Sequence, residues 1–279
     1  MTSEPTQLWA SAEAAERWRS TAAQRQQTVG AVTDLMLDAV GLESDFRVLD
    51  LAAGTGDTSI LVARRVGPRG SVLAVDISAA MLQEAAAAAT REGLANIETL
   101  VSDIALLDLP PQTFDAAISR FGLMFLTDVV EGLRRIRRAL KPGARLAAAV
   151  WSAQGRNPHI EIPLAVAAEF GHAPPEGSPM RRAASLGGPG VFASALESAG
   201  FVDVDVRPVP TPRAFESVDA ALDSLQLNST VLRQILNELD SARRQAALSE
   251  LRSRLQEFAQ SDGRCVISGE ALLGVASAP

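Results

Sequence analysis

The stretch Arg47–Ile60, RVLDLAAGTGDTSI, places two glycines directly after a short apolar run. Gly54 and Gly56, separated by Thr55 alone, allow the backbone to turn tightly and to approach a ligand with no Cβ in the way. Ligands of open α/β sheets bind beyond the carboxyl ends of the strands, so the loop at 52–57 is the expected site. The stretch therefore predicts a strand, a ligand-binding loop and a helix in succession.

Short apolar runs alternate with helix-like segments between residues 46 and 151. The runs predicted as strands lie at 46–52, 71–77, 97–103, 114–121 and 144–151. The segments between them carry apolar residues at helical spacing, and Ser78 and Asp128 stand where helix N-caps are expected. Strands that alternate with helices form parallel sheets covered on both faces. We therefore predict an α/β fold.

The sequence after Trp151 is less regular. A helix-like segment at 191–201 precedes an alternating, strand-like one at 202–210. A long helical stretch at 215–260, with one segment at 218–227 and another at 229–260, precedes a last strand-like run at 264–278. We predict an N-terminal helical lid segment at 1–45, a core at 46–151, and a remainder at 152–279. The remainder completes the sheet and carries a helical cap at 215–260, within the same domain.

Composition narrows the class of protein. A net charge of −7 and a pI near 5.0 argue against nucleic acid as the main partner, because phosphate binding requires a basic face. We see neither a signal peptide nor an apolar stretch of about 20 residues that could span a membrane, so we predict a cytoplasmic protein. The lone Cys265 excludes an intrachain disulfide and a cysteine-cluster metal site, and we predict no metal. The sequence leaves open whether the chain forms a homodimer.

Acidic residues surround the glycine loop. Asp50 and Asp57 flank the glycines, and Ser59 stands where the dinucleotide fingerprint requires its third glycine. Asp76 ends the second predicted strand, where an acid can accept hydrogen bonds from ribose hydroxyls, and Asp103 ends the third. Acids at three successive strand ends predict a nucleoside ligand that carries a positive charge and no phosphate.

Five segments in this order resemble the motifs of class I S-adenosylmethionine-dependent methyltransferases: VLDLAAGTGD, VLAVDISAAML, VSDI, FDAAISRFGLMFLTD and LKPGARLAAAVW. The AGTGD motif is similar to that of the ubiquinone/menaquinone-biosynthesis C-methyltransferase type. The resemblance covers roughly residues 46–151. It implies a doubly wound, mostly parallel, seven-stranded Rossmann-like sheet with helical cap insertions. It also implies S-adenosyl-L-methionine as the cofactor and S-adenosyl-L-homocysteine as its product.

The resemblance also implies roles for individual residues. The implied cofactor-binding residues are Asp50, Ala52, Gly54, Gly56, Asp76, Ile77, Met81, Asp103, Ile104 and Ser119. The group from Asp50 to Gly56 would hold the methionine part, Asp76 the ribose and Asp103 the adenine. Ser119 and Arg120 would face both the cofactor and the acceptor. One departure is that Ala52 stands where the first glycine of the family's motif usually stands.

Candidate catalytic residues are few. Methyl transfer needs an aligned acceptor and exclusion of water, and a general base only when the acceptor must lose a proton. The chain has no tyrosine and two histidines, so the candidate bases are His159, His172 and Glu161. We name His159 and Arg120 as candidate catalytic residues; the alternatives are a surface histidine and an ordinary strand-end residue.

The sequence favours a small, apolar or amphipathic metabolite as the acceptor, because 152–190 and 215–260 are rich in Leu, Val and Ala. It does not distinguish methylation at O, N, C or S. One rival interpretation is a methyltransferase fold that only binds or catalyses a non-methylating reaction, and another is a nicotinamide-dependent oxidoreductase. Trp9 and Trp18 are predicted either to cover the cofactor as part of a lid or to dock the N-terminal helix.

Overall fold

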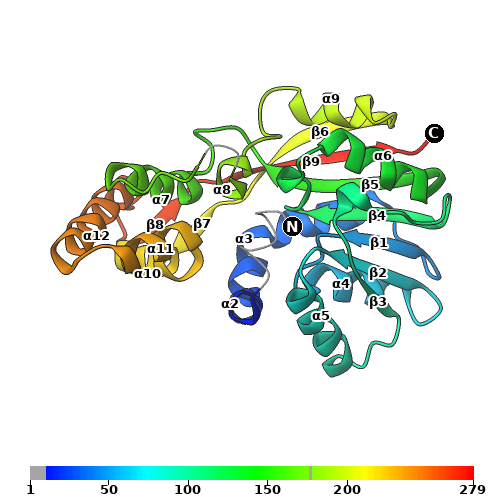
Figure 1. Ribbon diagram of the computed structural model, residues 1–279, viewed down its shortest axis with the longest axis horizontal. Coiled ribbons are helices and arrows are strands. Elements are labelled where there is room, and N and C mark those ends of the chain that lie inside the picture. Colours follow the sequence, from blue (N-terminus) through cyan, green and yellow to red (C-terminus); the bar gives the residue numbers. More distant parts are fainter. Residues whose placement is uncertain (1–10, 176–177) are drawn as a thin grey trace.

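A seven-stranded sheet forms the centre of the computed structural model, which describes residues 11–175 and 178–279 (Figure 1). Its strands are β1 (Arg47–Leu51), β2 (Ser71–Asp76), β3 (Ile97–Val101), β4 (Phe114–Arg120), β5 (Leu140–Trp151), β6 (Val202–Pro210) and β9 (Glu270–Ser277). The order is β3-β2-β1-β4-β5-β9-β6, and β9 runs antiparallel to both of its neighbours. The predicted doubly wound, mostly parallel sheet is therefore confirmed.

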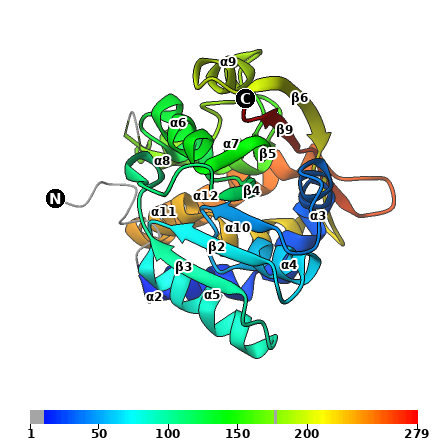
Figure 2. The same cartoon turned by 90° about the vertical axis from the view of Figure 1, so that its right-hand side faces the viewer.

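Helices cover both faces of this sheet. α3 (Ala22–Ala39), α4 (Asp57–Val66) and α5 (Ala79–Arg91) lie on one face, and α6 (Val129–Ala139) and α9 (Val191–Ser198) lie on the other (Figure 2). The predicted N-caps are confirmed: the Ser78 hydroxyl accepts a hydrogen bond from the Met81 amide at 3.2 Å, and Asp128 accepts one from the Glu131 amide at 2.9 Å. These bonds satisfy amides that the first helical turn leaves unpaired.

A cap lobe lies at one end of the molecule (Figure 1). It consists of α7 (Pro158–Glu169), α10 (Val218–Asn228), α11 (Thr230–Glu238), α12 (Ser241–Gln256) and a two-stranded sheet of β7 (Arg213–Phe215) and β8 (Cys265–Ile267). The lobe has a core of its own, in which Leu232, Leu251 and Cys265 are fully buried. Much of the apolar content of the cap therefore packs against itself.

Each of two stretches in the second half contains a break that the sequence pattern did not predict. The long helical stretch at 215–260 is three helices, because Ser229 and Asp240 each cap a new helix through a side-chain oxygen. The last strand-like run is two strands in different sheets, joined through Ser268 and Gly269. A Cβ at Gly269 would lie 2.4 Å from the Thr211 carbonyl oxygen, so only glycine allows this close approach.

The N-terminal segment forms α2 (Ala12–Ser20) and α3. α2 packs on α5, where Ala14 and Ala15 contact Met81 in a small buried cluster. Trp9 lies outside the described residues. The remaining short elements are η1 (Ile104–Leu106), η2 (Leu123–Phe125) and α8 (Pro179–Arg182).

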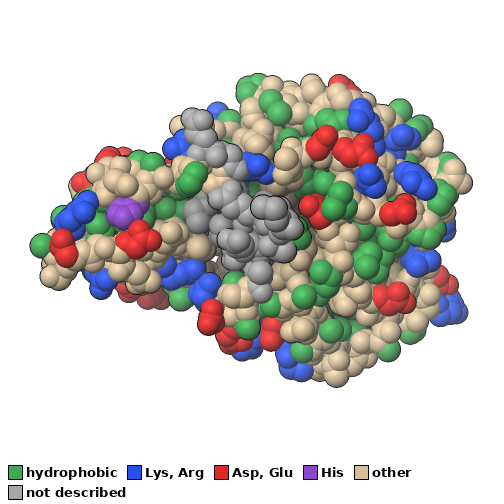
Figure 3. All heavy atoms as spheres, viewed as in Figure 1, with side chains coloured by type: hydrophobic (Ala, Val, Ile, Leu, Met, Phe, Trp, Pro, Cys, Tyr) green, Lys and Arg blue, Asp and Glu red, His purple; other side chains and the backbone are tan. Residues whose placement is uncertain are grey.

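Acidic and basic side chains are interspersed over both lobes on the face seen in Figure 3. No helix within the described ranges has the length and apolar character that crossing a bilayer requires.

Candidate functional site

The glycine loop between β1 and α4 adopts backbone conformations that favour glycine. Ala52, Gly54 and Gly56 have φ values of 57°, 56° and 83°. A Cβ at Gly56 would also lie 2.9 Å from the Ala85 Cβ, so this glycine is required for the loop to pack on α5. The left-handed conformation of Ala52 gives a physical reason why glycine usually stands at this position in the family's motif.

Asp76, at the end of β2, holds this loop in place. Its Oδ2 accepts a hydrogen bond from the Gly54 amide at 2.9 Å, and its Oδ1 accepts one from the Ser78 amide at 2.9 Å. Burial raises the pKa of the carboxyl group, while its bonds to backbone amides act in the opposite direction. The carboxylate predicted to bind ribose therefore also shapes the loop predicted to hold the methionine part.

Asp50 is buried beneath the loop. It is 1% exposed and accepts a hydrogen bond from the Ser59 hydroxyl at 2.6 Å. Burial raises its pKa to about 7, although Ser59 and the charge of Arg120 oppose the shift. Direct contact between Asp50 and a ligand stays a prediction, because its observed partner is Ser59.

Asp57 is paired within the protein. Its Oδ2 lies 2.7 Å from Arg25 Nη2 and 3.2 Å from Arg120 Nη2. Burial alone would raise the pKa of Asp57, but these two guanidinium groups hold it below its ordinary value. The negative charge of Asp57 is thus balanced by two arginines, rather than left free to attract a cationic ligand as its position beside the glycines suggested.

Ser119 and Arg120 end β4 next to the loop. The fully buried Ser119 hydroxyl donates to the Leu51 carbonyl oxygen at 3.0 Å. Besides its pairing with Asp57, Arg120 donates to the Thr33 hydroxyl at 3.2 Å, so its guanidinium joins α3 to α4. These contacts give Arg120 a structural role, and its proposed contact with a substrate stays a prediction.

The register of the sheet brings the predicted cofactor residues to one edge. Leu51 pairs with Val75 on one side and Ser119 on the other, and Asp76 pairs with Val101 just before Asp103. Asp103 caps η1 by accepting a hydrogen bond from the Ala105 amide at 2.9 Å. Of the neighbouring predicted residues, Ile104 and Met81 are buried and Ile77 is half-buried.

A row of three rings leads from β4 toward the cap lobe. The Phe121 and Trp151 rings stack with centroids 4.1 Å apart, and the His159 ring meets Trp151 edge-on at 5.0 Å. His159 is 6% exposed, so the alternative of a surface histidine is wrong. Burial, with a smaller contribution from the charge of Arg213, lowers the pKa of His159 well below its ordinary value. The imidazole is therefore neutral near pH 7.

The other two candidate bases already have partners. His172 Nδ1 lies 2.9 Å from a Glu238 carboxylate oxygen in the cap lobe. Glu161 accepts a hydrogen bond from the Gly155 amide at 2.7 Å. Only His159 among the three belongs to the row of rings that begins at β4.

The N-terminal helices contact the glycine loop through Trp18 and Arg25. The Arg25 guanidinium lies 4.3 Å from the centre of the Trp18 ring, and Trp18 Nε1 lies 3.4 Å from where a Cβ at Gly54 would be. Trp18 thus lies against the loop, and that it covers the cofactor as part of a lid stays a prediction. No local pattern links Arg25 to Asp57, because the two are 32 positions apart.

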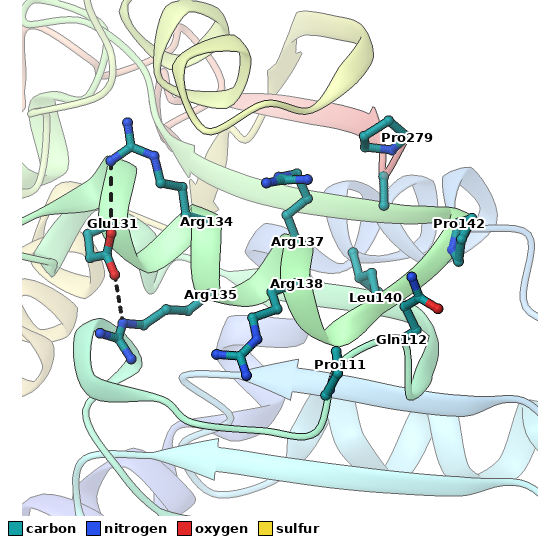
Figure 4. Close-up of a pocket in the computed structure, with 11 residues that line it drawn as sticks. Pro111, Gln112, Glu131, Arg134, Arg135, Arg137, Arg138, Leu140, Pro142 and Pro279 are labelled. Atoms are coloured by element: carbon teal, nitrogen blue, oxygen red, sulfur yellow. Dashed lines mark ion pairs between the residues drawn. The ribbon is translucent and has the colours of Figure 1, made fainter.

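A surface pocket of about 520 Å³ lies at the opposite edge of the sheet, between α6 and the start of β5 (Figure 4). Four arginines of α6 line it, and Figure 4 shows Glu131 paired with Arg134 and Arg135. Arg137 donates to the Ala199 carbonyl oxygen at 2.8 Å, and Arg138 lies 3.6 Å from Asp108. These arginines thus have protein partners, and the pocket is separate from the glycine loop.

Comparisons with known proteins agree with this geometry. Residues 26–164 match the model of the ubiE/COQ5 methyltransferase family. The ubiquinone/menaquinone biosynthesis C-methyltransferase UbiE of Cellvibrio japonicus is 39% identical over 127 residues, which are 45% of this chain and 49% of that protein. The match thus spans about half the length of this curated relative.

Solved structures share the fold over a longer part of the chain. A phosphoethanolamine N-methyltransferase 2 of Haemonchus contortus is 17% identical with a TM-score of 0.62, covering 100% of this chain and 61% of that one. The [4+2]-cyclase SpnF is 21% identical with a TM-score of 0.56, covering 90% and 82%. At such identities the likeness concerns the fold alone. The ordered motifs, the family match and the identity with UbiE show that residues 26–164 form the core of a class I S-adenosylmethionine-dependent methyltransferase of the ubiE/COQ5 type.

Proposed function

We propose that the protein transfers a methyl group from S-adenosylmethionine to a small, apolar or amphipathic metabolite. The observation that carries this proposal is the position of Asp76, whose carboxylate lies at the end of β2 and accepts a hydrogen bond from the Gly54 amide at 2.9 Å. Two carboxylate oxygens offer about four acceptor sites, so oxygens already bonded to amides can still accept from the hydroxyls of a ribose. The family match over residues 26–164 supports the same ligand.

The other residues that we expect to bind the cofactor lie at the same edge of the sheet as Asp76. The loop at 52–56 would lie along the methionine part, and Asp103 with Ile104 would lie beside the adenine. The sulfonium of S-adenosylmethionine supplies an electrophilic methyl group. The chain's own residues then have to bind and orient the acceptor and to exclude water. α2, which packs on α5 through Ala14, Ala15 and Met81, is placed to contribute to that exclusion.

Isothermal titration tests the cofactor assignment. We expect saturable binding of S-adenosylmethionine and S-adenosylhomocysteine and none of NADH. Asp76→Ala should weaken binding by about tenfold or more, since it removes a charged acceptor. Asp108→Asn is the matched control, because Asp108 is 80% exposed and lies away from the loop. Binding of NADH without S-adenosylmethionine would refute the proposal.

Methyl transfer itself needs a second measurement. Incubation with S-adenosylmethionine labelled in its methyl group, together with a metabolite extract, should yield a labelled small molecule. Circular dichroism of each variant shows whether a loss of binding reflects unfolding. If the cofactor binds but no labelled product forms under any condition, the protein uses the fold for binding or for a non-methylating reaction.

A further inference from the structure

Two polar side chains with buried, unpaired nitrogen atoms lie where the cap lobe joins the core. His159 is in the first turn of α7 and is 6% exposed. Neither Nδ1 nor Nε2 of its ring has a hydrogen-bond partner among the described residues. A neutral imidazole has one donor and one acceptor, so both of its hydrogen-bonding positions are unused.

Arg213 is the first residue of β7 and is the second of these side chains. Its Nε is buried and has no hydrogen-bond partner in the described part of the chain. None of the ion pairs found between described residues includes Arg213, and burial lowers the pKa of its guanidinium to about 10. Asn157 Nδ2 donates to the Glu270 carbonyl oxygen at 3.0 Å, and the Thr211 amide donates to the Gly269 carbonyl oxygen at 2.8 Å. The segments two residues before His159 and two residues before Arg213 therefore meet at adjacent residues, and the charge of Arg213 contributes to lowering the pKa of the imidazole.

The Arg213 side chain is half-buried, so its guanidinium has lost part of its water without gaining an acidic partner among the described residues, which is unfavourable. Buried polar groups are nearly always satisfied, so an unpaired group near a second one indicates a missing water, ion or ligand. The Thr211 hydroxyl, two residues before Arg213 and 1% exposed, is also unpaired within the described ranges. The polar groups without hydrogen-bond partners at this junction therefore include one that carries a positive charge.

The row of rings connects this junction with the candidate cofactor site. Phe121 directly follows the end of β4, its ring stacks on Trp151, and Trp151 meets His159 edge-on. Gly122 packs against the glycine loop, since a Cβ there would lie 2.3 Å from the Ala52 Cβ. An acceptor that reached His159 and Arg213 would therefore lie beside aromatic faces and near the predicted methionine part.

We propose that His159 and Arg213 bind an ionised oxygen of the methyl acceptor, and that the acceptor is a planar, conjugated molecule bearing a carboxylate, enolate or phenolate. The guanidinium supplies the charge and a directed N–H donor, and the imidazole supplies a second donor. The rings of Trp151 and Phe121 supply a flat apolar wall. This inference rests on the proposed methyl transfer and names the chemical class of the acceptor.

Benzoate is a suitable probe, with benzamide as its neutral isostere. The chain has two histidines, so long-range ¹H–¹⁵N spectra contain two imidazole signal sets, which His172→Asn assigns. In the full chain, with S-adenosylhomocysteine present, benzoate should shift the His159 signals saturably. Its dissociation constant should be at least about tenfold lower than that of benzamide, since only benzoate carries the charge.

Variants of Arg213 test whether its guanidinium causes the preference for benzoate over benzamide. Arg213→Gln should remove the preference for benzoate, while Arg213→Lys should keep part of it. Arg207→Gln is the matched control, because Arg207 is an exposed arginine of the neighbouring strand β6. Equal shifts by benzoate and benzamide, no shift of His159, or an unchanged preference in Arg213→Gln would each overturn the inference.

The comparison of benzoate with benzamide in the unaltered protein remains decisive if Arg213→Gln does not fold. Titration of S-adenosylhomocysteine alone separates the two proposals. If the cofactor product binds and benzoate shows no preference, the acceptor class is wrong and the proposed function stands. If S-adenosylhomocysteine does not bind, the proposed function itself fails.

Discussion

Arg25 and Asp57 form an ion pair, with Arg25 Nη2 2.7 Å from Asp57 Oδ2, that ties α3 to the first turn of α4. Both side chains are mostly buried, with exposed fractions of 16% and 23%. Arg25 also donates to the Thr21 hydroxyl at 2.8 Å, at the junction of α2 and α3. One guanidinium therefore positions the N-terminal helices, Trp18 and the start of the helix that follows the glycine loop.

We expect Arg25→Gln to lower the free energy of unfolding by about 2 kcal/mol, since it removes charged hydrogen bonds while Arg120 still pairs with Asp57. Hydrogen exchange should speed up in residues 12–39 more than in the sheet. Urea unfolding and exchange mass spectrometry measure the two effects. Arg19→Gln, which removes the exposed Arg19–Glu16 pair, is the control and should change little. Equal effects of the two variants would contradict this role of Arg25.

Gly56→Ala should be markedly more destabilising than Gly41→Ala. Both glycines have positive φ values, 83° and 63°, so each substitution carries a backbone cost of roughly 1–2 kcal/mol. Only at Gly56 does the new Cβ also meet Ala85, at 2.9 Å, which should add about 1–3 kcal/mol. Thermal unfolding of the two variants compares them directly. Similar losses would show that α5 can move away from the loop.

The buried Asp50 makes stability depend on pH. Its pKa is raised to about 7 in the folded protein, so between the unfolded value of 3.8 and pH 7 the folded state binds more protons than the unfolded state. The contribution of Asp50 to stability therefore falls as pH rises through this window. Asp50→Asn removes the effect, so its stability relative to the unaltered protein should rise by about 2–3 kcal/mol between pH 5 and pH 8.

Urea unfolding of both proteins at several pH values measures this difference. Asp108→Asn serves as the control, because Asp108 is 80% exposed. A difference between Asp50→Asn and the unaltered protein that stays constant with pH would show that Asp50 ionises normally in the fold.

The fluorescence of Trp18 should change when a ligand binds at the glycine loop. Its Nε1 lies 3.4 Å from the Cβ position of Gly54, so a ligand beside that backbone changes the surroundings of the indole. In a Trp9→Phe, Trp151→Phe background, S-adenosylmethionine should change the fluorescence saturably, with the dissociation constant found by calorimetry. Trp18→Phe in the same background serves as the blank. Cofactor binding with no change in Trp18 emission would place the ligand away from α2.

Local patterns identified most of the core. The strands of residues 46–151 and the N-caps Ser78 and Asp128 depend on neighbouring residues, through alternation, helical spacing and side chains that reach amides three positions away. The division of 264–278 into two strands was missed, because both halves are apolar and the bend at Gly269 depends on Thr211, far away in the sequence. Within 215–260 the sequence predicts one segment that ends at 227 and a second that begins at Ser229. The further break at Asp240 was not predicted, although aspartate is a common N-cap.

The sequence by itself determined the family, the α/β class and the set of residues at the carboxyl edge of the sheet, because consecutive strands of such a fold bring their ends together. Only the tertiary structure decided which charges are already neutralised and which are not. Asp57 is balanced by Arg25 and Arg120, while the buried ring nitrogens of His159 and the buried Nε of Arg213 have no hydrogen-bond partners among the described residues. The reason is physical: burial and pairing depend on residues far apart in the chain that meet only when the cap lobe and the N-terminal helices pack onto the sheet.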